Sequence, residues 1–247
     1  QLAVVCGIGC SGRLSGYVYA YGMHTTHGRA LPFAQGLKLA HPELNVIACG
    51  GDGDGMAIGL GHTYHAIRRN VNLTYILMDN HVYGLTKGQT SPRSDWGFKT
   101  KTTPTGNIET PVATLEMALS AGASFVAQGF STQLQELTDL IVAAVKHPGF
   151  SLVNVFSPCV TFNKVNTYDW FKERLVGIDS IEDYDRYDKG KVLQHILEHE
   201  GLLTGLLYED RKKRSYEEVS GLANNNQMQS VRKFTKAEFN KLVEDFR

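Results

Sequence analysis

The sequence contains no apolar run that approaches the ~20 residues that a membrane-spanning helix needs. It also lacks a net charge, because 25 basic residues balance 25 acidic residues. A strongly basic surface is typical of proteins that bind nucleic acids or anionic membranes, so neither partner is expected here. The 247 residues, 42% of them hydrophobic, are enough to bury a sizeable core.

Cysteine is scarce as well, since the chain has only Cys6, Cys10, Cys49 and Cys159. Four cysteines in a chain of this length do not resemble a disulfide framework, so we expect a protein of the reducing cytoplasm. Cys6 and Cys49 lie inside apolar runs and are most simply small core residues. Cys10 and Cys159 instead follow the ends of predicted strands, which is a different position.

Glutamate is nearly absent from the first hundred residues. Between Gln1 and Glu109 the only glutamate is Glu43, in a turn that leads into a predicted strand. It therefore lies at the opposite end of that strand from the polar loops described below.

The regular pattern of the chain is an alternation of short apolar runs with helical segments. The runs are continuous rather than alternating, as expected of strands that are covered on both faces. The predicted strands are Leu2–Cys6, Val46–Cys49, Leu73–Met78, Ser124–Ala127 and Leu152–Phe156. The predicted helices are Leu31–Ala40, Met56–Arg69, Thr114–Ala121 and Ser131–Lys146, the last with Ser131 as its N-cap. This order predicts an α/β domain over residues 1–160, with a doubly wound, mainly parallel sheet.

Two segments depart from this alternation. Residues 85–113 are rich in Thr, Ser, Pro and Gly and predict a long loop, of a length that is usually functional or disordered. Residues 161–247 are more polar, with helices expected over 189–200 and 236–246. We expect these residues to form a C-terminal extension that packs on the sheet domain or on a partner subunit.

Polar, glycine-rich loops follow four of the predicted strands. Ligands of open α/β sheets bind beyond the carboxyl ends of the strands, so these loops are the candidate site. If the sheet is parallel, all four lie at one edge. They are Gly7–Ser11, Gly51–Asp54, Asp79–Gly84 and Ser157–Cys159.

The first of these loops matches the G-x-G-x-x-G pattern of dinucleotide-binding folds, but its context does not. A helix should follow the pattern, and Gly16 interrupts it; an acidic residue should come about 20 residues later, and the first is Glu43. A nicotinamide cofactor is therefore not expected.

The second and third loops together suggest a magnesium site. Twenty-six residues separate Gly51-Asp52-Gly53 from Asn80, which is room for one helix and one strand. Asp52, Asn80 and the backbone carbonyl of Val82 would supply three oxygen ligands, and phosphate oxygens and a water would complete the octahedron that Mg²⁺ prefers.

This GDG-x26-N pattern resembles the thiamine diphosphate signature, and the resemblance extends further. The blocks VVCGIGCSGR, HTTHGRALPFAQGLKLAHPELNVIACGGDGDGMAIG, MDNHVYGLTKGQTSP and NVFSPCVTFN resemble the β subunit of the 2-oxoacid:ferredoxin oxidoreductases, in family order, from about residue 2 to 210. The resemblance implies oxidative decarboxylation of a 2-oxoacid to acyl-CoA and CO₂, with ferredoxin as electron acceptor, or the reverse reaction. The family's basic residue at the position of Arg13 favours 2-oxoglutarate, and pyruvate and branched 2-oxoacids stay open.

The resemblance also implies which residues hold the cofactors. The residues that match thiamine diphosphate contacts are Ile8, Gly9, Cys10, Ser11, His27, Gly53, Asp54, Gly84 and Leu85. Asp52, Asn80 and Val82 match the Mg²⁺ ligands, in agreement with the spacing. Cys10 and Cys159 match two of the four cysteine ligands of a [4Fe–4S] cluster. The other two are expected in a segment upstream of residue 1.

A substrate contact and a partner subunit follow from the same resemblance. The family places a basic residue at the position of Arg13, near the 2-oxoacid, where a guanidinium can bind a carboxylate. A solvated loop charge is the alternative for Arg13. The family takes the glutamate that activates thiamine diphosphate from an α subunit, so we expect this chain to be inactive alone and to form a heterodimer or a dimer of heterodimers.

Two other functions stay open at the level of the sequence. One is a thiamine diphosphate-dependent 2-oxoacid decarboxylase subunit without an iron–sulfur cluster. The other is a non-catalytic nucleotide-binding module, which would leave the spacing from Asp52 to Asn80 as a coincidence.

Overall fold

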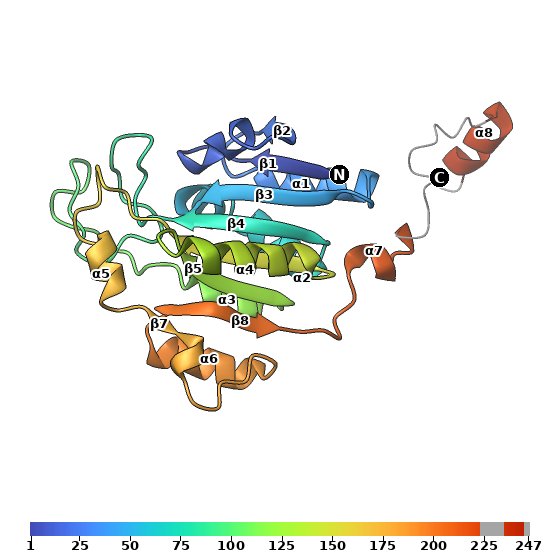
Figure 1. The fold of residues 1–247 in the computed structure, drawn as a ribbon. Helices are drawn as coiled ribbons and strands as arrows, with labels where there is room; N and C mark the ends of the chain where they lie inside the picture. Colours follow the sequence, from blue (N-terminus) through green and yellow to red (C-terminus); the bar gives the residue numbers. More distant parts are fainter. Residues whose placement is uncertain (223–234, 245–247) are drawn as a thin grey trace.

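In the computed structural model, which describes residues 1–222 and 235–244, the core is an eight-stranded sheet with the order β2-β1-β3-β4-β6-β5-β8-β7 (Figure 1). Neighbouring strands are parallel except β5 and β8, which confirms the predicted mainly parallel α/β fold. The strands are β1 (Leu2–Cys6), β2 (Tyr21–His24), β3 (Asn45–Gly51), β4 (Leu73–Asp79), β5 (Phe125–Phe130), β6 (Phe150–Phe156), β7 (Val176–Gly177) and β8 (Leu203–Glu209).

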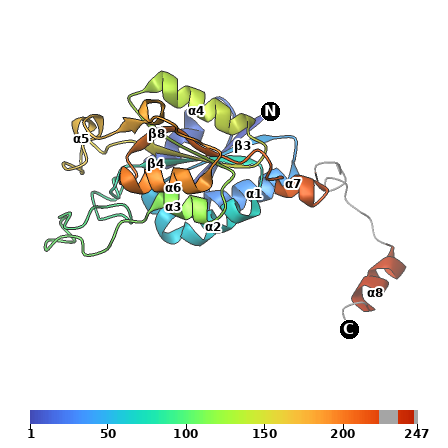
Figure 2. The same cartoon turned by 90° about the horizontal axis from the view of Figure 1, so that it is seen from below.

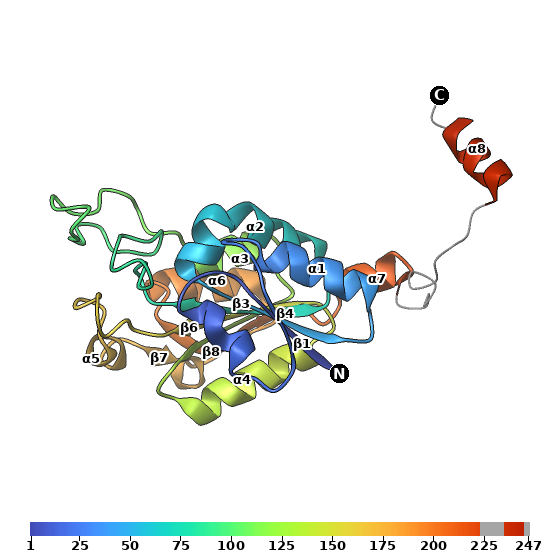
Figure 3. The same ribbon diagram turned by 90° about the horizontal axis from the view of Figure 1, so that it is seen from above.

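Helices cover both faces of this sheet (Figures 2 and 3). One face carries α1 (Ala30–Ala40), α2 (Leu60–Arg69), α3 (Thr114–Ser120) and α6 (Lys189–Glu198), and the other carries α4 (Leu134–Lys146). The shorter segments are η1 (Ser11–Gly16), η2 (Asp54–Ile58), α5 (Tyr168–Lys172), η3 (Ile178–Ser180), α7 (Tyr216–Val219) and α8 (Lys236–Glu244). None of the helices in the described ranges is both long and apolar enough to cross a lipid bilayer.

Successive strand residues contribute to the two faces of the core in turn. Val5 and Ala48 pack in the cluster under α1 and α2, whereas Val4 and Cys49 pack in the cluster under α4. Because both faces are buried, most side chains of both sets are apolar, and the buried polar exceptions such as Gln128 and Asn154 are hydrogen-bonded to each other.

The structure differs from the predicted elements at several points. The sequence pattern does not predict β2, β7 or β8. Of these, β2 is short and largely exposed, and β7 spans only two residues. Ser131 does not cap α4, which begins at Leu134 after Gln133 and has no side-chain cap. The predicted helix from Met56 starts instead as the wider turn η2, and α2 begins at Leu60.

The segment after residue 160 contributes to the sheet as well as to the surface. Its strands β7 and β8 continue the sheet beyond β5. The division at residue 160 stays a prediction, and the end of the helix predicted over 236–246 lies outside the described residues.

The long loop predicted at residues 85–113 has no regular structure but is held in place beyond the carboxyl end of β4. Arg93 Nε donates to Asp79 Oδ2 at 2.9 Å, and Ser94 Oγ donates to the His81 carbonyl at 2.6 Å. Asn107 Nδ2 in turn donates to the Ser94 carbonyl at 2.9 Å. These bonds position the loop beside the ends of β3 and β4.

The opposite end of the sheet is joined through one buried asparagine. Asn70 ends α2 in the left-handed region, with φ of 56°. Its Oδ1 accepts hydrogen bonds from Ser124 Oγ at 2.6 Å and from the Phe150 backbone N–H at 3.0 Å. Its Nδ2 donates to the Arg214 carbonyl at 3.0 Å, so one side chain links α2, β5, β6 and the segment before α7.

Replacing this residue tests how much the junction contributes to stability. Asn70→Ala is expected to lower the free energy of unfolding by about 3 kcal/mol or more, because buried partners lose their bonds and alanine is disfavoured in the left-handed region. Asn70→Gly removes the bonds but relieves the backbone, so its loss should be smaller by about 1 kcal/mol. Urea unfolding measures both; a loss below about 1 kcal/mol for Asn70→Ala would contradict the role of this junction.

Candidate functional site

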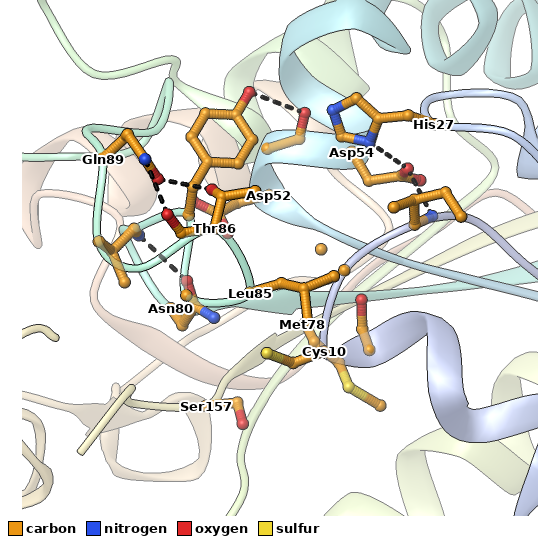
Figure 4. Close-up of a pocket in the computed structure, with 18 of the residues that line it drawn as sticks. Cys10, His27, Asp52, Asp54, Met78, Asn80, Leu85, Thr86, Gln89 and Ser157 are labelled. Carbon is orange, nitrogen blue, oxygen red and sulfur yellow. Dashed lines mark hydrogen bonds and ion pairs between the residues drawn. The ribbon is translucent and has the colours of Figure 1, made fainter. Parts of the chain in front are cut away.

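A cavity of about 650 Å³ lies beyond the carboxyl ends of β1, β3, β4 and β6 (Figure 4). The four predicted loops all contribute to its lining, as expected for one edge of a parallel sheet. The lining includes every residue predicted to contact the cofactor or Mg²⁺, namely Ile8, Gly9, Cys10, Ser11, His27, Asp52, Gly53, Asp54, Asn80, Val82, Gly84 and Leu85.

Strand register brings the two halves of the predicted magnesium site together. Gly51 on β3 pairs with Met78 on β4, so Asp52 leaves the sheet next to Asp79 and Asn80. Asp52 is only 2% exposed, and its carboxylate accepts hydrogen bonds from Ser91 Oγ and from the backbone of Asn80. Burial and the neighbouring Asp79 raise the pKa of Asp52 to about 7. Ser91, Arg93 and Asn80 therefore stabilise the ionised form of this buried carboxyl group only in part.

The loop after β4 is packed tightly against the loop after β3. Tyr83 Oη donates to the Gly53 carbonyl at 3.2 Å, and a Cβ atom on Gly53 would lie 2.0 Å from the Tyr83 ring. Only glycine fits there. The Asn80 side chain is oriented by its own loop, since Oδ1 accepts from the Val82 N–H at 3.0 Å. A carbonyl oxygen has a second lone pair, which leaves this atom able to bind a cation.

Asp54 braces the loops on the other side of the cavity. Its Oδ1 accepts from the backbone N–H groups of Ile8 at 2.9 Å and Gly28 at 2.7 Å. The same oxygen lies 2.9 Å from His27 Nδ1, and because a carboxylate only accepts, this nitrogen carries the proton. The His27 Nε2 atom is thereby left for a ligand. A Cβ atom on Gly7 would lie 2.0 Å from Asp54 Oδ2, so only glycine fits next to this carboxylate.

Two cysteine sulfurs lie at the edge of the cavity. A Cβ atom on Gly84 would be 3.4 Å from Cys159 Sγ and 3.7 Å from Cys10 Sγ, so both sulfurs flank the same backbone position. Cys10 is exposed and Cys159 is half-buried, and both are free thiols. Cys6 and Cys49 are buried opposite each other on β1 and β3, as expected of core residues. That Cys10 and Cys159 bind a cluster stays a prediction.

Arg13 lies outside this lining. It is exposed on η1, and its contact with a substrate carboxylate stays a prediction. The lining contains no glutamate in the part of the chain that the structure describes, and Glu43 is exposed in the turn before β3, at the far end of that strand.

The sequence pattern did not predict the residues that contact the buried carboxylates of the site. Ser91 and Arg93 both belong to the long loop, yet they reach the carboxylates at the ends of β3 and β4. No spacing or period in the sequence marks such contacts. Tyr83, packed on Gly53, was missed for the same reason.

Comparison with known families agrees with this geometry. Residues 7–155 match the model of the thiamine pyrophosphate enzymes, C-terminal TPP binding domain. Residues 159–224 match the model of the C-terminal part of the pyruvate ferredoxin oxidoreductase beta subunit. The two matches follow one another along the chain, in the order of the sheet domain and the segment after it.

Curated relatives point to the same group. The chain is 48% identical over 185 residues to the 2-oxoacid:ferredoxin oxidoreductase 2, subunit beta, of Aeropyrum pernix, covering 75% of this chain and 60% of the relative. It is also 48% identical over 172 residues to the 2-oxoglutarate synthase subunit KorB of Archaeoglobus fulgidus, covering 70% of this chain and 64% of the relative. The chain thus spans less than two thirds of the length of either relative.

A solved structure superposes on the whole chain. It is a 2-oxoglutarate:ferredoxin oxidoreductase from Magnetococcus marinus with 2-oxoglutarate, coenzyme A and succinyl-CoA bound, and it is 40% identical with a TM-score of 0.88, covering 100% of this chain and 83% of the other. The family models, the relatives and the fold agree, and the chain belongs to the thiamine pyrophosphate enzymes and, among them, to the β-subunit family of the 2-oxoacid:ferredoxin oxidoreductases.

Proposed function

We propose that this chain binds thiamine diphosphate, Mg²⁺ and part of a [4Fe–4S] cluster in an enzyme that oxidatively decarboxylates a 2-oxoacid to acyl-CoA and CO₂. Ferredoxin accepts the electrons, and the reaction can also run in reverse. The observation that carries the proposal is the buried and only partly compensated Asp52 carboxyl group beside Asn80 in a cavity of cofactor size. Relatives named 2-oxoglutarate synthase, and a similar structure with 2-oxoglutarate and coenzyme A bound, favour 2-oxoglutarate over pyruvate as the substrate.

The donor atoms at the ends of β3 and β4 suit Mg²⁺. The Asp52 carboxylate, the Asn80 amide oxygen and the Val82 carbonyl are hard oxygen ligands. A divalent cation would also stabilise the ionised form of Asp52, which burial and Asp79 disfavour. In residues 1–222 and 235–244 there is no group of three His, Cys, Asp or Glu side chains that could hold a metal ion. The proposed Mg²⁺ ligands do not form such a group, because Asp52 is the only one of these four residue types among them.

The other lining residues suit thiamine diphosphate. The backbone N–H groups of the Gly9–Ser11 and Gly53 loops can donate to the diphosphate, and so can His27 Nε2 when the ring carries both protons. The exposed side chains of Ile8 and Leu85 offer apolar contacts to the rings. When bound, thiamine diphosphate supplies the electron sink that decarboxylation of a 2-oxoacid requires. The chain itself orients the cofactor and shields it from water.

The cysteine pair distinguishes the proposed oxidoreductase from a decarboxylase subunit without a cluster. Cys10 and Cys159 flank Gly84 at the cavity edge, where thiolates can bind an iron–sulfur cluster. Two further thiolates would come from outside these 247 residues. If the chain belonged to a decarboxylase without a cluster, the two cysteines would have no function at this position. If it were a non-catalytic module, the buried Asp52 would have none. Four free thiols also agree with our proposal of a cytoplasmic protein.

The absence of glutamate from the described lining supports the proposed partner. Thiamine diphosphate still needs a group that promotes loss of its ring proton, and Glu43 lies at the wrong end of β3. We propose that an α subunit lies over the cavity and supplies that glutamate.

Asp52→Asn in the β subunit, purified with its α subunit, tests the metal site. The variant keeps the shape of the side chain but loses its charge, so we expect the Mg²⁺-dependent affinity for thiamine diphosphate to fall at least about tenfold. Calorimetric titration with Mg²⁺ or with EDTA measures it, and Asp139→Asn on the exposed face of α4 is the control. An affinity equal to that of the control would exclude Asp52 as a ligand.

Cys159→Ser in the full-length β subunit tests the cluster. The variant should lose the broad visible absorption of a [4Fe–4S] cluster and its iron content, because one thiolate ligand is removed. Cys49→Ala, inside β3, is the control and should keep both. A cluster that survives in Cys159→Ser would contradict our assignment.

Separating the subunits tests the partner. The isolated chain should show no 2-oxoacid-dependent reduction of a viologen dye, and addition of the α subunit should restore it, because the catalytic glutamate comes from that subunit. Turnover by the isolated chain at a rate comparable to that of the complex would overturn the requirement.

A further inference from the structure

The turn that begins at Cys159 packs on the loop that carries two of the proposed Mg²⁺ ligands. We call residues 159–163 the cysteine turn. It is closed by a hydrogen bond from the Asn163 backbone N–H to the Cys159 carbonyl at 3.1 Å. The ring of Phe162 packs on Gly88, where a Cβ atom would lie 3.0 Å from it. The cysteine turn is therefore in direct contact with the loop after β4.

The last residue of the cysteine turn uses its whole side chain in hydrogen bonds. Asn163 is 1% exposed. Its Nδ2 donates to the Asn80 carbonyl at 3.2 Å and to Asn166 Oδ1 at 3.0 Å. Its Oδ1 accepts from the backbone N–H groups of Val165 at 3.0 Å and Asn166 at 2.9 Å. Because all of these groups lie out of contact with water, loss of the side chain leaves buried partners without a bond.

The bond to Asn80 holds the backbone of a proposed Mg²⁺ ligand. The Asn80 N–H donates to the Asp52 carboxylate, and its carbonyl accepts from Asn163. This carbonyl belongs to the peptide bond before His81, which adopts φ of 58°, a conformation that non-glycine residues seldom take. Both backbone polar groups of Asn80 are thus bonded, and the direction of its side chain is fixed.

The same segment is also tied to the long loop of residues 85–113. Asn166, which is 1% exposed, donates from Nδ2 to Asp95 Oδ2 at 2.8 Å. The bonds therefore run without a break from Cys159 through Asn163 to Asn80, and through Asn166 to Asp95. A displacement of the cysteine turn would displace the backbone of Asn80 as well.

We propose that Asn163 is a positioning residue that fixes Asn80, at the proposed Mg²⁺ site, relative to Cys159, at the proposed cluster site. The inference rests on the proposed function, which assigns those two sites. It adds a residue that lies outside the lining of the cofactor cavity and acts through the backbone of both ligand residues.

Asn163→Ala in the full-length β subunit, purified with its α subunit, tests the contact with Asn80. We expect the Mg²⁺-dependent affinity for thiamine diphosphate to fall at least about tenfold in calorimetric titration, because the ligand residue loses its support. Asn70→Gly is the control, since it removes an equally buried, hydrogen-bonded asparagine at the opposite end of the sheet. It should bind as the wild type does. Equal affinities in the two variants would overturn the inference.

The reduced cluster reports on the other end of the link. Asn163→Ala should keep the iron content of the wild type, because no thiolate is removed. Its electron paramagnetic resonance spectrum should nevertheless differ from that of the wild type, because the turn that carries Cys159 is altered. Asn70→Gly should give the wild-type spectrum. A lower affinity for thiamine diphosphate with an unchanged spectrum would overturn the link between the two sites.

Asn163→Asp separates the bond to Asn80 from the shape of the cysteine turn. Its carboxylate can still accept from the N–H groups of Val165 and Asn166, but it has no hydrogen to donate, and its second oxygen faces the Asn80 carbonyl. The affinity for thiamine diphosphate should fall at least as far as in Asn163→Ala. Wild-type affinity in Asn163→Asp would assign the effect to the turn alone and overturn the inference.

Hydrogen exchange separates this inference from the proposed function. In the complex without added cofactor, Asn163→Ala should speed the exchange of the amides of residues 80–84, whereas Asn70→Gly should not. Faster exchange in a complex that binds no thiamine diphosphate would support the placement of this loop by Asn163 and overturn the function. Unchanged exchange in a complex that does bind it would leave the function standing and overturn the inference.

Discussion

The site depends on one buried negative charge at the end of a parallel strand. Asp52 leaves β3 where the register with β4 places Asp79 and Asn80 beside it. A buried carboxylate next to a second one is unfavourable unless a cation or hydrogen bonds compensate it. Arg93 forms an ion pair with Asp79, whereas Asp52 is stabilised by hydrogen bonds and only by the more distant charge of Arg93. The proposed Mg²⁺ supplies what remains, so metal binding and the folding of this edge are physically linked.

Close packing of backbone on side chains keeps that edge rigid. The ring of Tyr83 lies on Gly53, and the carboxylate of Asp54 fills the space beside Gly7. In each case a side chain of one loop occupies the volume that a Cβ atom of another loop would need. The loops after β1, β3 and β4 therefore hold one another in place.

In our proposal the chemistry is divided between this chain and its partner. This chain would supply the oxygen ligands, the diphosphate donors and two thiols, and its described lining has no glutamate.

The sequence by itself determined the mainly parallel sheet and the residues at its carboxyl edge. Strands buried on both faces are mostly apolar, and the GDG-x26-N spacing spans one helix and one strand, so the local pattern predicted that Asp52 and Asn80 lie close together. Only the tertiary structure decided the contacts made by residues far apart in the chain. Ser91 on Asp52, β8 beside β5 and the contact of Asn163 with Asn80 follow from how a long irregular loop and a polar C-terminal segment pack. Such packing has no period, because it is set by the shapes and hydrogen bonds of the surfaces that meet.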